Sequence, residues 1–106
     1  MTARVLVPRE VKRGAPFPVR IAIQHVMETG FRYDLFGKPI PKNVVNSLVC
    51  RYDGAEVFRA EMGSGIAANP YLQFYTVAQN SGELEFSWVD DAGVQGSEQV
   101  AVNVVD

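Results

Sequence analysis

The chain has 106 residues and a mass of 11.7 kDa, which is enough for one domain with a hydrophobic core. Hydrophobic residues make up 47% and charged residues 21% of the chain, so disordered and low-complexity classes of protein are excluded. Ten Lys and Arg residues against twelve Asp and Glu give a net charge of −2, and the basic residues are scattered, which argues against nucleic acid or an anionic membrane as partner. The expected partner is another protein.

No segment approaches the run of about 18 apolar residues that a membrane helix needs, and the first residues do not have the pattern of a signal peptide. Read by itself, the sequence therefore indicates a cytoplasmic protein. No internal repeat or linker interrupts the chain, so we expect a single domain over residues 1–106.

Apolar and polar residues alternate along several short segments, which is the pattern of half-buried β-strands. In one of these segments, Phe17, Val19, Ile21, Ile23 and His25 fall on one face. No window carries the apolar spacing of an amphipathic helix. Strands are therefore expected at residues 4–7, 17–25, 44–52, 55–62, 71–78, 83–89 and 100–104.

This series of short strands, separated by turn residues and with Trp88 in one strand, predicts an all-β fold. The specific expectation is an immunoglobulin-like antiparallel β-sandwich of about seven strands. The chain has one cysteine, so the disulfide that joins the sheets of antibody domains is absent and the comparison concerns the architecture alone.

The dipeptide Asp-Gly at residues 53–54 is the strongest local signal, because it favours the type I′ turn of a two-residue β-hairpin. A regular hairpin about this turn pairs Val49 with Phe58 and Cys50 with Val57. Both faces of the hairpin would then carry apolar side chains, whereas one face of such a strand pair usually faces water. We therefore expect the second face to be covered, either by a loop of this chain or by a partner subunit.

Residues 25–43, HVMETGFRYDLFGKPIPKN, form an unusually long connection between two expected strands. Connections longer than about 12 residues are usually functional or disordered, and the aromatic content of this one favours order. Aromatic, Met and Arg side chains are enriched at the cores of interfaces, which indicates a binding loop, although a loop that packs on its own sandwich is at least as common. The second long connection, GSGIAANP at residues 63–70, either lets a partner's backbone come close or is a plain crossover.

The possible chemistry is limited by the presence of one cysteine, Cys50, and one histidine, His25. The two together would make a minimal thiol nucleophile and base, but Cys50 lies in the middle of an expected strand and the sequence offers no evident third residue. A blue-copper site needs two histidines, and the turn at Asp90-Asp91 offers too few oxygen atoms for calcium. We therefore expect no catalytic residue, metal or cofactor, and do not expect an enzyme.

Three segments carry a family resemblance: HVMETGFRYD, IPKNVVNSLVCRYDGAEVFRAEM and IAANPYLQFYTVAQNSGELEFSWVDDAG. The chain resembles the SoxZ family, subunits of the SoxYZ sulfur-carrier complex of bacterial thiosulfate oxidation. The resemblance implies an immunoglobulin-like, non-catalytic subunit that binds SoxY. In that family SoxY carries the sulfur intermediates on a cysteine of a flexible arm, and the complex presents this arm to the other Sox enzymes in transient contacts.

The resemblance also implies a periplasmic location, reached by export together with SoxY, and this replaces the cytoplasmic expectation. Self-association of the isolated chain stays open. The alternatives are a generic immunoglobulin-like protein-interaction module and a small thiol-active domain that uses Cys50 and His25. As residues that line or rim the contact with SoxY we predict His25, Met27, Glu28, Arg32, Asn69 and Tyr71.

Overall fold

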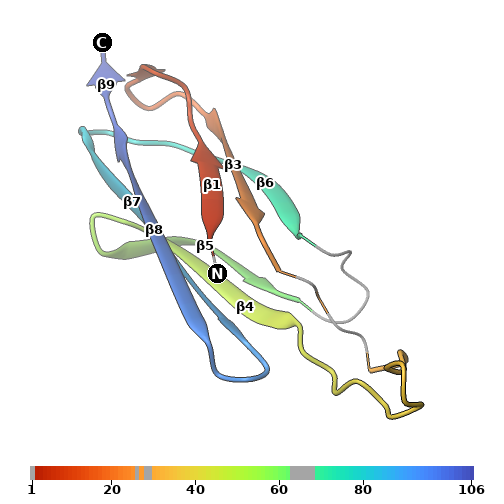
Figure 1. Ribbon diagram of the computed structural model, residues 1–106. Helices are drawn as coiled ribbons and strands as arrows, with labels where there is room; N and C mark the ends of the chain where they lie inside the picture. The colour runs from red at the N-terminus through yellow and green to blue at the C-terminus, as the bar shows by residue number, and fades with distance from the viewer. Residues whose placement is uncertain (1, 26, 28–29, 63–68) are drawn as a thin grey trace.

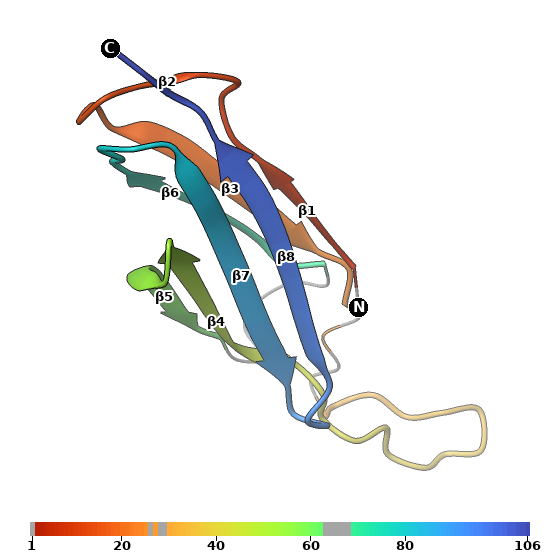
Figure 2. The same ribbon diagram turned by 90° about the vertical axis from the view of Figure 1, so that its left-hand side faces the viewer.

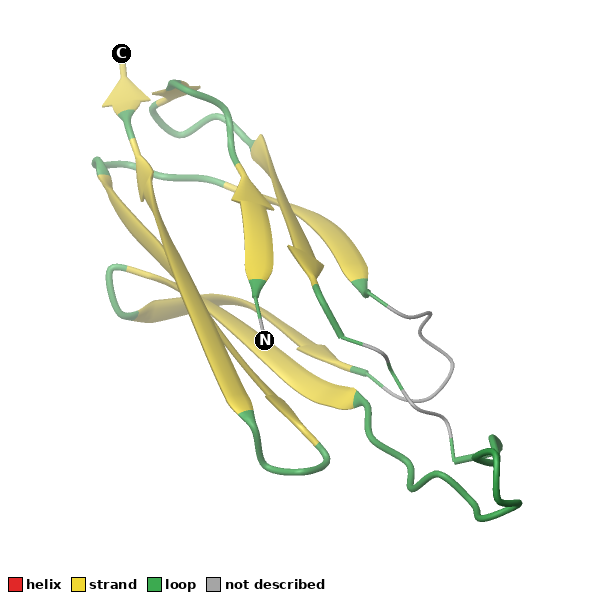
Figure 3. Cartoon of the chain, viewed as in Figure 1, coloured by secondary structure: helices red, strands yellow, loops and turns green. Residues whose placement is uncertain are grey.

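The computed structural model describes residues 2–25, 27, 30–62 and 69–106, and within these residues every regular element is a β-strand (Figure 3). The resemblance and the alternation of apolar residues both predict an all-β chain, and this fold class is confirmed. The strands are β1 (Ala3–Leu6), β2 (Val11–Lys12), β3 (Phe17–Ile23), β4 (Val45–Tyr52), β5 (Ala55–Glu61), β6 (Tyr71–Thr76), β7 (Gly82–Asp90), β8 (Gln95–Val102) and β9 (Val104–Val105).

The strands form two antiparallel sheets that face each other, as in an immunoglobulin-like sandwich (Figures 1 and 2). One sheet has the order β1-β3-β6 and the other has the order β5-β4-β7-β8. A short parallel pair, β2 with β9, ties the segment after β1 to the end of the chain. The sandwich therefore leaves four strands at sheet edges: β1, β6, β5 and β8.

The core lies between the sheets and follows the predicted alternation. Every second residue of β3 is buried, and Val19, Ile21 and Ile23 are all no more than 1% exposed. In β7 the inward positions are Leu84, Phe86, Trp88 and Asp90, so an acid continues an otherwise apolar series. The sequence predicts the last strand only at residues 100–104, where the apolar residues lie. In the structure β8 begins earlier, at Gln95. Its first inward position is Gly96, which lies beneath the Trp88 indole and therefore carries no apolar side chain.

The predicted turn between β4 and β5 is confirmed, since Asp53 and Gly54 both have positive φ angles, of 49° and 90°. The predicted register is wrong beyond the turn. A β-bulge adds Val57 to β5, so that Cys50 pairs with Phe58 and Val49 pairs with Arg59. The bulge turns Phe58 into the core and Val57 outward.

The shift in register removes the reason to expect a covered second face. Val49 on the outer face is flanked by Arg59 and, two residues further along β5, by Glu61. The hairpin therefore has one apolar face and one mixed, largely polar face, as an ordinary sandwich strand pair does.

The molecule is long and narrow. Its extents are 60 × 19 × 18 Å and its radius of gyration is 16.2 Å, against about 13 Å for a compact domain of this size. A loop between β3 and β4 projects beyond one end of the sandwich (Figure 2). No helix able to span a membrane occurs in the described part of the chain.

Candidate functional site

Residues 30–43, which we call the projecting loop, form a short hairpin of their own. Tyr33 and Pro39 make an antiparallel bridge. Asp34 N–H donates to Lys38 O at 2.8 Å, and Ile40 N–H donates to Arg32 O at 2.8 Å. These bonds are the start of a ladder, so the loop has a defined shape while it extends away from the sandwich.

Asp34 fixes the tip of the projecting loop. Its Oδ1 accepts the N–H of Phe36 at 2.8 Å and the N–H of Lys38 at 2.9 Å, which is the Asx-type bonding typical of aspartate in turns. Gly37 has a φ of 76°, a conformation that glycine adopts without strain. The segment YDLFGK at residues 33–38 therefore forms a tight turn that presents Leu35 and Phe36 outward.

The tip carries large apolar side chains that the chain itself does not cover. Leu35 is fully exposed at 101%, Phe36 is 88% exposed and Phe31 is 83% exposed, with Tyr33 also exposed. Three cationic side chains, Arg32, Lys38 and Lys42, accompany the single carboxylate of Asp34. Exposed apolar groups clustered in this way mark an interaction site, and the charge favours a partner with acidic groups around an apolar pocket.

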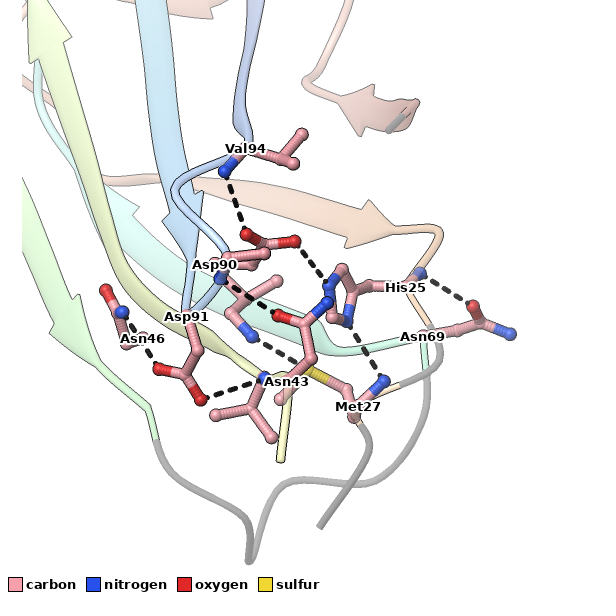
Figure 4. A network of polar contacts seen from close by, with 11 residues as sticks. His25, Met27, Asn43, Asn46, Asn69, Asp90, Asp91 and Val94 are labelled. Carbon is pink, nitrogen blue, oxygen red and sulfur yellow. Dashed lines mark hydrogen bonds and ion pairs between the residues drawn. The ribbon is translucent and has the colours of Figure 1, made fainter. Parts of the chain in front are cut away.

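A buried polar network holds the base of the projecting loop (Figure 4). His25 Nε2 lies 3.1 Å from Asp90 Oδ2, and the two side chains are 7% and 4% exposed. Met27 N–H donates to His25 Nδ1 at 3.0 Å. Because Nδ1 accepts, the network assigns the ring proton to Nε2, which donates it to Asp90.

Asp90 also shapes the turn between β7 and β8. Its Oδ1 accepts the N–H of Val94 at 2.9 Å. Burial by itself raises the pKa of Asp90, but hydrogen bonds from His25, from Val94 and Ala92, and from Asn43 outweigh burial, so the pKa of this carboxyl is below its ordinary value. Asp90 is therefore an ionised acceptor that joins His25 after β3, the turn between β7 and β8, and Asn43 of the projecting loop.

Met27 and Asn69 are both hydrogen-bonded to His25 and lie in the two long connections of the chain. Asn69 Oδ1 accepts the N–H of His25 at 3.0 Å, and Asn69 N–H donates to His25 O at 2.6 Å. The N–H of Val45 points to Met27 Sδ at 3.2 Å. Met27 and Asn69 have positive φ angles of 58° and 54°, which non-glycine residues adopt rarely.

A second carboxylate secures the return of the projecting loop into β4. Asp91 Oδ2 accepts the N–H of Val44 at 3.2 Å, and Asp91 Oδ1 accepts the side-chain N–H of Asn46 at 3.1 Å. Lys42 Nζ lies 4.0 Å away from Asp91 Oδ2. The C-terminal end of the projecting loop is thus bonded to the turn that follows β7.

The structure brings together three of the six predicted partner-binding residues, His25, Met27 and Asn69, at the base of the projecting loop. The side chains of His25 and Met27 are buried, so their place is in positioning the loop. Arg32 lies on the loop and is exposed, and Tyr71 is exposed on β6, away from the network. Glu28 lies outside the described residues. Contact of these residues with a partner stays a prediction.

Sequence reasoning missed Asp90 and Asn43 as members of this network. The sequence indicates an ordinary turn at Asp90-Asp91, and the structure has a turn at this place. The overlooked signal is the position of Asp90 in the inward series of Leu84, Phe86 and Trp88. A carboxylate on the buried face of a strand requires hydrogen-bond partners, and the chain's single histidine is one of them.

Cys50 does not meet His25. Cys50 is fully buried in β4, paired with Phe58 on one side and with Phe86 on the other. Burial raises the pKa of its thiol to about 12, which is the opposite of what a nucleophilic cysteine needs. Among the described residues, no three His, Cys, Asp or Glu side chains are grouped closely enough to hold a metal ion.

The fold is shared with several solved structures. The chain is similar to the superoxide reductase (neelaredoxin) of Ignicoccus hospitalis, with a TM-score of 0.78 and 18% identity over 99% of this chain and 81% of that one. It is similar to a putative superoxide reductase of Thermotoga maritima, with a TM-score of 0.75 and 13% identity over 98% and 86%. It is also similar to the sulfur carrier protein SoxY of Chlorobium limicola f thiosulfatophilum, with a TM-score of 0.68 and 11% identity over 98% and 79%. At such identities the similarity shows the fold alone.

The family is shown by the sequence. A search of curated proteins finds no significant match, but the model of the family "Sulphur oxidation protein SoxZ" matches residues 4–101, nearly the whole chain. The resemblance predicted from the three segments above is thereby confirmed. The chain belongs to the SoxZ family and is a component of the Sox sulfur-oxidation system.

Proposed function

We propose that this chain is the non-catalytic half of a sulfur carrier, which binds SoxY and supports the presentation of SoxY's carrier cysteine to the other Sox enzymes. The observation that carries the proposal is the projecting loop. Its tip places Leu35 and Phe36 in solvent on a framework of hydrogen bonds. Burying each of these side chains in a partner stabilises a complex by about 1.5–3 kcal/mol.

The network at the base of the loop supports this assignment. A loop that must enter a partner's pocket binds more tightly when it is held in its bound shape beforehand. Buried Asp90 supplies part of that constraint, because its carboxylate is hydrogen-bonded both to buried His25 and to Asn43 of the loop. The charges of Arg32, Lys38 and Lys42 favour a SoxY surface with acidic groups around an apolar pocket.

The described residues offer little chemistry of their own, which is consistent with a non-catalytic role. The reactive sulfur is assigned to SoxY, in keeping with the SoxZ family as a non-catalytic component of the Sox system. Cys50, buried and with a raised pKa, is poorly suited to replace it.

The test is the affinity for the SoxY of the same organism, measured by titration calorimetry. A Leu35→Asp, Phe36→Asp double variant is expected to weaken binding by at least about tenfold, since each lost anchor removes more than 1.4 kcal/mol. Leu6→Asp is the matched control, because Leu6 is also exposed, at 53%, but lies on β1. Unchanged affinity of the double variant, or equal loss in the control, contradicts the assignment of the loop.

We further propose a periplasmic location reached in company with SoxY, on the support of the family resemblance. Cell fractionation tests it directly. The chain is expected in the periplasm when SoxY is co-expressed with its export signal, and in the cytoplasm when SoxY is expressed without that signal. A generic interaction module would show no dependence on SoxY.

A further inference from the structure

Strand β6 (Tyr71–Thr76) is an edge strand, because it pairs with β3 alone in the order β1-β3-β6 (Figure 1). Ile23 donates its N–H to Pro70 O at 2.9 Å, whereas the next residue, Gln24, donates to Thr2 O on the side of β1. Bonded pairs recur at every second residue of an antiparallel ladder. Leu72, Phe74 and Thr76 therefore bond to β3.

The alternate residues, Tyr71, Gln73 and Tyr75, direct their backbone N–H and C=O groups away from β3. None of the three finds a backbone partner in the part of the chain that the structure describes. Their side chains lie on the outer face, where Tyr71 is 57% and Tyr75 is 64% exposed. The edge is thus open in its backbone and aromatic on its outer face.

Proteins usually protect edge strands with charges, prolines or bulges. Strand β5 follows this rule, because it carries Glu56, Arg59 and Glu61 and is interrupted by the bulge at Val57. Strand β6, with the sequence YLQFYT, has no charge, no proline and no shift in its register with β3. It is therefore ready to accept another strand.

The sequence of β6 points to the strand that fits. Tyr71-Leu72-Gln73-Phe74-Tyr75 has nearly the same character in both directions from Gln73. We propose that β6 pairs antiparallel with β6 of a second copy of this chain, about a two-fold axis at Gln73. Tyr71 then lies opposite the second copy's Tyr75, and Gln73 lies opposite Gln73.

This register uses every outward backbone group of β6. The three pairs are all bonded pairs, and each exchanges two N–H···O bonds. Leu72 and Phe74 remain on the core side of each sandwich, while the tyrosines form cross-strand aromatic pairs on the outer face. The two sheets become one continuous sheet across the dimer, a self-complementary interface of the kind that closes a two-fold dimer.

Charge does not oppose the pairing. Arg20 is the charged residue of β3 opposite Gln73, and the Arg20 residues of two copies are three strand spacings apart, about 14 Å. This exceeds the screening length of about 8 Å at physiological salt. The proposal goes beyond SoxY binding, because the second copy occupies a sheet edge and SoxY occupies the projecting loop. It assigns Tyr71, predicted from the sequence to contact SoxY, to the second copy instead.

Sedimentation equilibrium of the full chain, alone and in complex with SoxY, tests the proposal. The wild-type chain is expected to dimerise, and Gln73→Lys is expected to weaken the dimer by about tenfold or more, since it sets two like charges directly opposite. Gln99→Lys on β8 is the matched control, as Gln99 is also exposed on an edge strand, and it should leave dimerisation unchanged.

Cross-linking tests the register. Residues opposite each other in a bonded pair have Cα atoms about 5.5 Å apart, within disulfide range. Gln73→Cys is expected to form a disulfide-linked dimer under mild oxidation, whereas Tyr75→Cys, which faces Tyr71, should not. Efficient cross-linking at residue 75 and none at residue 73 overturns the proposed register.

Two further outcomes overturn the proposal. In the first, the wild-type chain is a monomer alone and its complex with SoxY contains one copy of each chain. In the second, the Gln73→Lys variant no longer binds SoxY, which shows that SoxY occupies the β6 edge. The second outcome still shows that the wild-type chain binds SoxY, so it does not contradict the proposed function. Failure of the proposed function looks different, because the projecting-loop variants would then bind SoxY normally while the effects at Gln73 persist.

Discussion

The ring of Phe58 lies flat against the ring of Phe74, with 4.1 Å between centroids and 2° between planes. Phe58 belongs to one sheet and Phe74 to the other, and Phe74 in turn packs at 56° against Phe86. The stacked pair closes the gap between edge strands β5 and β6. It exists because the bulge at Val57 turns Phe58 inward.

Phe58→Ala is expected to lower the free energy of unfolding by about 2–3 kcal/mol, less than a fully buried phenylalanine because Phe58 is half-buried. Val57→Ala is the control, since Val57 faces solvent and should cost less than about 0.5 kcal/mol. Urea denaturation measures both values. A larger loss for Val57→Ala would restore the regular hairpin register and refute the bulge.

Asp90 predicts a pH dependence of stability. Because the pKa of Asp90 is lowered in the folded state, the carboxylate stabilises the fold above the ordinary aspartate pKa of about 3.9. That contribution is lost as the pH falls through the lowered, folded-state value. The Asp90→Asn variant is expected to have a lower melting temperature than the wild type at neutral pH. Its stability should also fall less steeply than that of the wild type below about pH 4.

Thermal unfolding followed across that pH range measures the Asp90 effect. Asp106→Asn is a suitable control, because Asp106 is 90% exposed and pairs with Arg13 at the end of the chain. It should leave the acid limb of the profile as in the wild type. Identical profiles for wild type and Asp90→Asn would show that the buried network does not depend on the charge of Asp90.

Cys50 is expected to be inert in the folded protein. With the pKa of its thiol raised to about 12 by burial, the thiolate is scarce at neutral pH and reagents reach it only through unfolding. A Ser97→Cys variant places an exposed thiol on β8 as the positive control. Alkylation of Cys50 as fast as that of residue 97 would revive the thiol-active alternative.

Gly96 is expected to tolerate no side chain. A Cβ at this position would lie 2.3 Å from Nε1 and Cε2 of Trp88, whose side chain is buried. Gly96→Ala should destabilise the protein by about 1–3 kcal/mol, with a change in fluorescence from the chain's one tryptophan. Ser97→Ala, an outward neighbour, is the control, and equal effects of the two would contradict the contact.

The alternation of apolar residues was sufficient to predict most strands, because burial of one face is a local property of each segment. The register between β4 and β5 was not predictable in the same way. Val57 and Phe58 are both apolar, so the sequence pattern fits a regular hairpin and a bulged one equally well. Phe74 on the opposite sheet favours the bulged hairpin, because its ring stacks on Phe58 only when Phe58 points inward.

In the candidate site, too, local features were predictable from the sequence and contacts between distant residues were not. The aromatic content of residues 25–43 indicated an ordered loop, but its projection from the sandwich depends on bonds between distant segments. His25 and Asp90 are 65 residues apart in sequence, and no local pattern pairs them. The three positive φ values at Met27, Asp53 and Asn69 were evident in sequence only at Asp53, where the following glycine marks a known turn.

The 60 Å length of so small a chain has a hydrodynamic consequence. The projecting loop lies at one end of the long axis and residue 106 at the other (Figure 1). A protein captured by the loop lengthens the particle and slows its end-over-end tumbling, whereas a copy docked along β6 broadens it. Rotational diffusion and small-angle scattering therefore separate the two associations by shape, even where their masses coincide.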